Sequence, residues 1–378
     1  ALGAFMAGFF LPLWLGFRLT CVAAMLINIV VAIVAFRLAR GAVLKSPAQG
    51  ESTPSSDAAT ELPSRSLKHG VLMVVCFVSG FGFLALEVVW TRMFAQVLEN
   101  SVYTFAAILV IVLLCLAVGA FISSRLARLK LPAVSLLATL LLAGGLAVAL
   151  APFIFMQLTD SLQILAMRGS WGSYILMIFG KGFLTIGPPA VLLGTVFPFL
   201  MKTEEPYASA VGQSLGRLAA INTSGAILGS LVCGFVFMGT FGMWGTTQLI
   251  AIVYAVAAIV LPVTWSMGGI ILRAAGVFLL MAVFSGLDPT RLPITSIDPM
   301  RRTNETILET WETSGCTVAV AQDERGLSLK MNSHYGLGST GAFRQEQFQA
   351  DLPLMVYPQT ESIFFLGMGT GITAGSSL

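Results

Sequence analysis

The sequence has little charge. Charged residues make up only 10% of its 378 residues, whereas 56% are hydrophobic and the mean hydropathy is +0.88. Soluble domains carry about 25% charged residues, so the composition excludes an ordinary soluble protein and predicts a mainly α, polytopic transmembrane helical bundle. The net charge is +3 without any long basic run, which excludes nucleic acid as a partner. The lipid bilayer is the expected partner, and the oligomeric state stays open.

Residues that bind metals are also scarce. The chain has two histidines, His69 and His334, and five cysteines, with no CxxC pair and no His/Cys cluster. We therefore predict no metal site. No signal peptide can be read, because Ala1 already lies in an apolar segment. We expect the sequence to be truncated at both ends.

Long apolar runs, in contrast, are abundant. A span needs about 20 apolar residues, and we predict spans over 1–16, 18–39, 70–95, 102–124, 131–155, 173–201, 217–240, 244–264 and 268–287. Residues 40–69 are rich in Ser, Pro, Ala and charge without an apolar period, which indicates a flexible linker. After residue 287 the composition becomes mixed and polar, as in a water-soluble part.

Residues 2–20 repeat the pattern of residues 228–246 without gaps. The identities are Leu2/Leu228, Gly3/Gly229, Gly8/Gly234, Phe9/Phe235, Gly16/Gly242 and Thr20/Thr246. Each glycine could serve only close helix packing, but the shared register favours two homologous membrane halves of a major-facilitator-like repeat. Residues 1–39 would then be the last two spans of the first half. Residues 70–287 would be the second half plus one extra apolar segment.

Basic residues gather in alternate loops, which predicts that the linker is cytoplasmic. They are Arg37, Arg40, Lys45, Arg65, Lys68, Arg125, Arg128, Lys130, Lys202 and Arg217. If 268–287 crosses the membrane, the soluble part lies on the opposite side. If that segment lies in the interface, the soluble part is cytoplasmic. The sequence leaves both alternatives open.

Four polar residues interrupt the apolar spans: Glu87, Arg92, Lys181 and Asn222. Charges in hydrocarbon are usually paired or face a cavity. We expect Glu87 to lie within hydrogen-bonding reach of Lys181, Arg92 or a buried polar group such as Asn222, and not to face lipid. The group is then either a structural ion pair or part of a substrate or proton path.

The polar tail shows signs of a β-hairpin and a nucleotide loop. Alternation predicts strands over 316–323 and 327–332 around a turn at 324–326. A helical pattern over 343–358 ends at Pro358. The apolar run 362–366 predicts a buried strand that leads into "GMGTG". Glycines there would let the backbone approach a ribose or phosphate, so Gly367, Gly369 and Gly371 are the candidate cofactor-binding residues.

Several stretches together resemble a known family. They are "FGFLALEVVWTRMFAQVLENSVYTFAAILVIVLLCLAVGAFISSRLA" (81–127), "PPAVLLGTVFPFLMK" (188–202), "GRLAAINTSGAILGSLVCGF" (216–235) and "LPLMVYPQTESIFFLGMGTGITAG" (352–375). They are similar to the fused bacterial inner-membrane proteins that join a major-facilitator-like bundle to a spermidine-synthase-like domain. The resemblance implies a Rossmann-like α/β domain, of which 362–378 is the truncated start and 288–361 the β-hairpin subdomain with its connecting helix.

The resemblance also implies a ligand and an activity. The expected co-substrate is S-adenosylmethionine or its decarboxylated form, and the expected reaction is transfer of an aminopropyl or methyl group to an amine in polyamine biosynthesis. The family's catalytic acid is expected beyond residue 378, so the catalytic residue is unknown. We expect no turnover from these 378 residues alone.

The chain departs from the family in the residues that contact the amine or cofactor. The family's Asp-Gly-x-x-Gln is Asn332, Ser333, His334, Tyr335 and Gly336 here, its Tyr-His-Glu is Gln345, Glu346 and Gln347, and its loop acid is Thr370. His334, Tyr335, Gln345 and Glu346 are candidate substrate contacts or, alternatively, surface and hairpin packing. A second hypothesis is therefore a transporter-like or scaffold protein with a ligand-sensing or inactive synthase-like domain.

Overall fold

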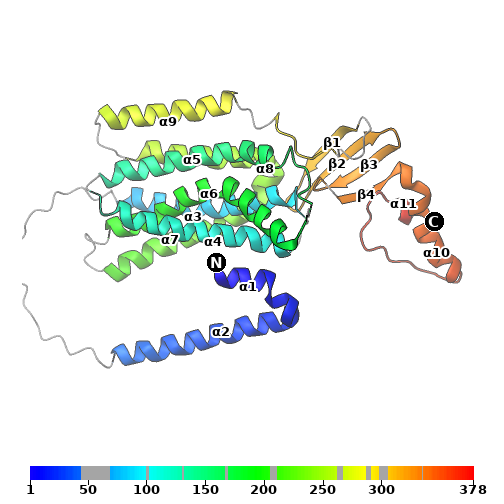
Figure 1. Ribbon diagram of the computed structural model, residues 1–378, viewed down its shortest axis with the longest axis horizontal. Helices are drawn as coiled ribbons and strands as arrows, with labels where there is room; N and C mark the ends of the chain where they lie inside the picture. Colours follow the sequence, from blue (N-terminus) through cyan, green and yellow to red (C-terminus); the bar gives the residue numbers. More distant parts are fainter. Residues whose placement is uncertain are drawn as a thin grey trace, which may run out of the picture.

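The computed structural model describes residues 1–43, 69–98, 102–129, 132–166, 169–204, 211–261, 267–286, 291–297, 305–333 and 335–378. The protein is mainly helical, with a bundle of long apolar helices and a small antiparallel sheet at one end of the bundle (Figure 1). Most of the predicted linker, 44–68, lies outside the described residues.

The helices follow the apolar runs, because in hydrocarbon a helix satisfies its backbone groups internally. They are α1 (Leu2–Phe9), α2 (Leu11–Val43), α3 (His69–Ala95), α4 (Val102–Leu126), α5 (Ala133–Leu158), α6 (Trp171–Glu204), α7 (Val211–Val232), α8 (Met238–Val260) and α9 (Met267–Gly286). A short π-helical segment, Cys233–Phe237, joins α7 to α8.

Six helical stretches among the described residues are long and apolar enough to cross a membrane: Leu11–Arg37, Gly70–Ala95, Tyr103–Leu126, Ala133–Leu158, Trp171–Lys202 and Gly212–Val260. The predicted span 1–16 is wrong as one helix, because α1 ends at Phe9 and α2 starts at Leu11. The predicted spans 217–240 and 244–264 form one helical stretch that breaks at Gly242. Helix α9 lies alongside α5 (Figure 1), and its apolar stretch Ala274–Phe284 is shorter than the six stretches given above.

The two copies of the repeated pattern break at the same position. Gly16 has φ 71° and ψ 166°, and Gly242, its match at an offset of 226, has φ 67° and ψ −177°. A side chain is strained at such positive φ values, so glycine is suited to both positions. After each break, the hydroxyl of the matched threonine donates to the glycine carbonyl, from Thr20 at 2.8 Å and from Thr246 at 2.6 Å. The repeat therefore specifies a local backbone geometry.

Helix α3 is central to the bundle and contacts α4, α6, α7 and α8. Its closest neighbour is α7, where glycines bring the two backbones together. A Cβ at Gly225 would collide with the carbonyl oxygen of Phe77, and one at Gly229 with that of Phe81. Gly234, in the π-helical segment, has open space around it. The close approach therefore ends before the π-helical segment.

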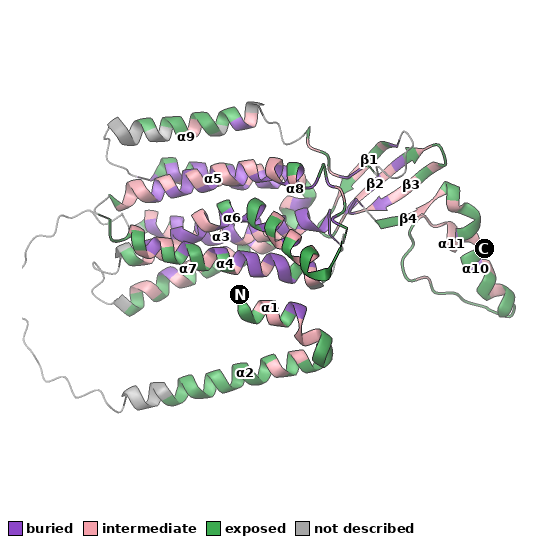
Figure 2. Cartoon of the chain, in the orientation of Figure 1, coloured by how far each residue is buried: buried purple, intermediate pink, exposed green. Residues whose placement is uncertain are grey.

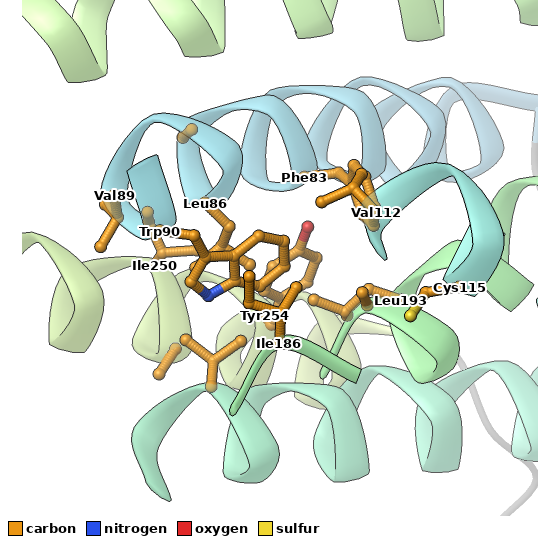
Figure 3. Close-up of a cluster of buried hydrophobic side chains, with 14 of the residues drawn as sticks. Phe83, Leu86, Val89, Trp90, Val112, Cys115, Ile186, Leu193, Ile250 and Tyr254 are labelled. Atoms are coloured by element: carbon orange, nitrogen blue, oxygen red, sulfur yellow. The ribbon is translucent and has the colours of Figure 1, made fainter. Parts of the chain in front are cut away.

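Large side chains fill the space on the other faces of α3. Trp90 and Phe83 from α3 meet edge to face, with ring centroids 6.1 Å apart. Trp90 is buried together with Tyr254 of α8 and Ile186 of α6 (Figure 3). In contrast, α2 is exposed along most of its length (Figure 2). Its apolar surface is suited to contact with lipid.

The sheet has the order β1-β2-β3-β4, with β1 (Thr306–Glu312), β2 (Thr317–Asp323), β3 (Gly326–Met331) and β4 (Tyr335–Ser339), all antiparallel. The predicted hairpin is confirmed, since β2 pairs with β3 around a turn at 324–325. A 3₁₀ turn, Thr340–Ala342, leads into α10 (Phe343–Val356), and α11 (Ile372–Gly375) is a single turn.

The predicted buried strand 362–366 is wrong. These residues have no regular structure, and Phe364 and Leu366 are 86% and 92% exposed. A strand is stabilised by a hydrogen-bonded neighbour, and the described strands pair only with one another in the order given above. High β-propensity alone therefore does not order this segment as a strand.

The sheet is joined to the C-terminal end of α3. The guanidinium of Arg92 donates to the carbonyl of Gly315 at 2.8 Å and to the Thr317 hydroxyl at 3.4 Å. Gln96 donates to Thr317 at 3.0 Å and accepts from Ser333 at 3.0 Å. Since α3 has 27 residues, its start after the linker lies about 40 Å from this junction. The start of α3 and the sheet therefore lie at opposite ends of the bundle.

A second contact joins β1 to the break in α8. The Glu312 carboxylate accepts a hydrogen bond at 3.0 Å from the amide of Met243, the first residue after Gly242. A Cβ at Gly242 would collide with that carboxylate. Burial raises the pKa of Glu312 above its ordinary value of 4.5, and the Met243 amide and the charge of Arg92 act in the opposite direction.

The α3–α7 packing predicts different outcomes for two matched substitutions. Gly229→Ala places a methyl group against the backbone of α3 and should lower the free energy of unfolding by about 1–3 kcal/mol, as overpacking does. Gly234→Ala enters open space and should be tolerated. Thermal unfolding in detergent measures both, and equal stability of the two variants would contradict the close approach.

The junction at Glu312 predicts a dependence on pH. Because the pKa is raised in the folded protein, the stabilisation by Glu312 is fully present below its unfolded pKa and is lost as pH rises through the folded pKa. Glu312→Gln keeps an acceptor for Met243 but removes this titration. The wild type should therefore be stabilised, relative to Glu312→Gln, more at about pH 4 than at about pH 7. A difference in melting temperature that is independent of pH would exclude this role.

Candidate functional site

The candidate site is a pocket of about 570 Å³. Helices α10 and α11, which contribute to its lining, lie beyond the sheet, away from the bundle (Figure 1). The pocket lies between β4, the start of α10 and the glycine loop, which we define as residues 367–371. The lining residues are Gly336, Leu337, Gly338, Ala342, Gln345, Glu346, Gln349, Phe364, Phe365, Leu366, Gly367, Met368, Gly369, Thr370, Thr373 and Ala374. The volume is suited to a small organic ligand.

The glycine loop has a backbone that favours glycine at three positions. Gly367, Gly369 and Gly371 have φ values of 86°, 56° and 78°. The amide of Gly371 donates to the carbonyl of Met368 at 2.9 Å, which closes a tight turn. Among the described residues, no acceptor receives a hydrogen bond from the amides of Met368 and Gly369. These donors lie in the lining and are available to a ligand.

Glu346, in the first turn of α10, holds the loop in place. Its carboxylate accepts from the amide of Ser339 at 2.8 Å and from the hydroxyl of Thr370. Its backbone carbonyl accepts from the hydroxyl of Thr373 at 3.0 Å. Gly338 in β4 has φ 141°, and a Cβ there would collide with the Glu346 carboxylate. The glycine in β4 therefore makes room for the carboxylate that supports the loop.

The structure brings some of the predicted site residues together. Gly367, Gly369, Gln345 and Glu346 all line the pocket, whereas Tyr335 and Gly371 do not. His334 lies outside the described residues.

Asn332 and Ser333, which stand where the family has an acid and a glycine, belong to the junction with the bundle. Asn332 accepts from the amide of Thr317 at 3.0 Å, and Ser333 donates to Gln96.

The described residues do not show the predicted pairing of Glu87 with the named partners. Among the described residues, no hydrogen bond or ion pair joins the Glu87 carboxylate to Lys181, Arg92 or Asn222. Lys181 donates to the carbonyl of Leu158, and Arg92 is used at the junction. Free carbonyls at the end of a helix or in a turn attract these cations without the cost of burying a carboxylate. The Oδ1 atom of Asn222 is buried without a partner among the described residues.

Sequence reasoning missed several members of the site. Gly338 carries a detectable signal, because a glycine inside a strand often marks a close approach of backbone or ligand. Gln349 gives no such signal, since it becomes a lining residue only through the fold of α10 onto the loop. Gln96 and Glu312 at the junction were also missed, and their partners lie far away in the sequence.

No family model, curated protein or solved structure matches this chain. The likeness to spermidine-synthase-like membrane proteins therefore rests on the sequence stretches alone, and the geometry described above has to carry any functional proposal.

Proposed function

We propose that this protein is a membrane-bound, spermidine-synthase-like transferase whose pocket binds a donor of the S-adenosylmethionine type. The observation that carries the proposal is the glycine loop, where positive-φ glycines present amides beside the Glu346 carboxylate in one pocket. Loops of this kind admit a ribose or phosphate against the backbone. The loop and the preceding segment would begin a Rossmann-like domain.

The chemistry of the lining is suited to a nucleoside donor. Phe365 and Met368 give apolar surface for a flat base, and the loop amides give donors for hydroxyl or carboxylate oxygens. Transfer of an aminopropyl or methyl group then requires an aligned acceptor amine and a base that takes its proton. The membrane would be the bacterial inner membrane.

A second candidate function is a ligand-sensing scaffold. One observation favours it: the residues in place of the family's amine contacts, Asn332 and Ser333, bind the end of α3. The sheet also lies at the end of the bundle away from the start of α3 and from Arg125 and Arg128 at the end of α4. By the positive-inside rule we infer that the sheet end is the non-cytoplasmic one. S-adenosylmethionine is expected in the cytoplasm, so the side of the membrane separates the two candidates.

Binding is tested with one substitution in the loop. Gly369→Val puts a β-branched residue at φ 56° with its Cβ 3.0 Å from the carbonyl oxygen of Leu337, which is strained. It should weaken binding of S-adenosylmethionine and its decarboxylated form by at least about tenfold, measured by calorimetry of the detergent-solubilised chain. Gly375→Ala, in open space on α11, is the matched control and should bind as the wild type does. If the wild type binds neither donor, the transferase proposal fails.

The side of the membrane is tested by labelling. Glu324 and Arg128 are exposed and lie at the two ends of the bundle. Glu324→Cys and Arg128→Cys, each without the natural cysteines, should react in opposite compartments with an impermeant maleimide applied to intact cells. Labelling at Glu324→Cys alone would favour the sensing scaffold. Labelling at Arg128→Cys alone would favour the transferase, and labelling of both from outside would contradict the described arrangement.

A further inference from the structure

The pocket has one charge on its wall. Glu346 is the single charged residue among the described residues that line it, and its side chain is held inside the structure with only 9% of the residue exposed. Its neighbour Arg344 lies on the exposed side of α10 and is not part of the lining. A buried carboxylate without a cationic partner attracts a positive charge strongly, because the surrounding dielectric is low.

The hydrogen bonds of Glu346 leave room for a ligand. One carboxylate oxygen accepts from the amide of Ser339 and the other from the hydroxyl of Thr370. Both donors are neutral, so nothing in the described part of the chain compensates the charge. A carboxylate can accept about four hydrogen bonds, and the hydrogen bonds from described residues use two of them. The carboxylate is fixed in position before a ligand arrives.

We propose that Glu346 is the specificity-determining residue of this pocket and selects nucleosides that carry a cationic centre, a sulfonium or an ammonium group. The neutral nucleoside of the same shape binds less tightly. The inference rests on the proposed function, since it takes the nucleoside donor as the ligand. In this proposal, Glu346 on α10 selects the charge of the ligand. The glycine loop provides hydrogen-bond donors and lets the ligand approach the backbone.

The test compares two ligands in the detergent-solubilised chain. Decarboxylated S-adenosylmethionine carries positive charge, and 5′-methylthioadenosine is its neutral counterpart. Glu346→Gln should weaken binding of the charged ligand by roughly tenfold, as expected for loss of a charge-assisted contact, and should change binding of the neutral ligand by less than about twofold. Asp351→Asn removes a carboxylate from the same helix that does not line the pocket and should leave both affinities unchanged.

A second variant separates charge selection from support of the loop. Thr370→Val removes the hydroxyl that donates to Glu346 but keeps the carboxylate, so the preference for the charged ligand should persist. Equal loss of both ligands in Glu346→Gln, or loss of the preference in Thr370→Val, would show that Glu346 only supports the loop. Wild type that binds neither ligand would instead refute the proposed function, and this inference with it.

Discussion

The attachment of Arg92 to the loop between β1 and β2 is the contact on which the placement of the soluble part depends. A guanidinium at the end of an apolar helix has to find acceptors, because an unpaired buried charge costs several kcal/mol. The carbonyls of Thr313 and Gly315 supply them, at 3.5 and 2.8 Å. Gln96, four residues after Arg92, extends this network by donating a hydrogen bond to Asn332 and accepting one from Ser333. Arg92 and Gln96 thus bind the sheet instead of lining a path through the membrane.

Two glycines determine how the helices reach that end of the bundle. Gly16 and Gly242 break their helices with nearly the same backbone angles, and a threonine four residues later bonds back to each glycine carbonyl. At Gly242 the break also leaves the amide of Met243 free of the helix, and this amide donates a hydrogen bond to the carboxylate of Glu312 in β1. At Gly16 nothing lies within 4 Å of a Cβ position. Both copies therefore have the same glycine break, but among the described residues only the break at Gly242 contacts the sheet.

The sequence predicted what depends on neighbours along the chain and missed what depends on distant ones. Apolar runs predicted the helices, because a helix satisfies its own backbone in lipid, and alternation predicted the β2–β3 hairpin. The repeat was visible as identities, but its meaning as a shared break at Gly16 and Gly242 was not. The prediction of a strand over 362–366 was wrong, because a strand depends on a hydrogen-bonded neighbouring strand that the local sequence does not reveal. In the site, Gly367, Gly369, Gln345 and Glu346 were predicted, whereas Gly338 becomes significant only beside the folded carboxylate.

Strand β4 and the turn before it connect the pocket to the end of α3. Ser333 and Asn332, two and three residues before Tyr335 at the start of β4, adopt φ values of 64° for Ser333 and 47° for Asn332. This conformation costs residues with side chains about 1 kcal/mol or more. Their bonds to Thr317, Gln96 and Ser296 hold this turn. Gly336 and Gly338 of β4 then line the pocket, and Ser339 at its end donates to Glu346. A shift of the α3 end would therefore move the turn, the strand and the carboxylate together. The position of Glu346 in the pocket is thereby tied to the packing of the bundle, whichever of the two proposed functions the pocket performs.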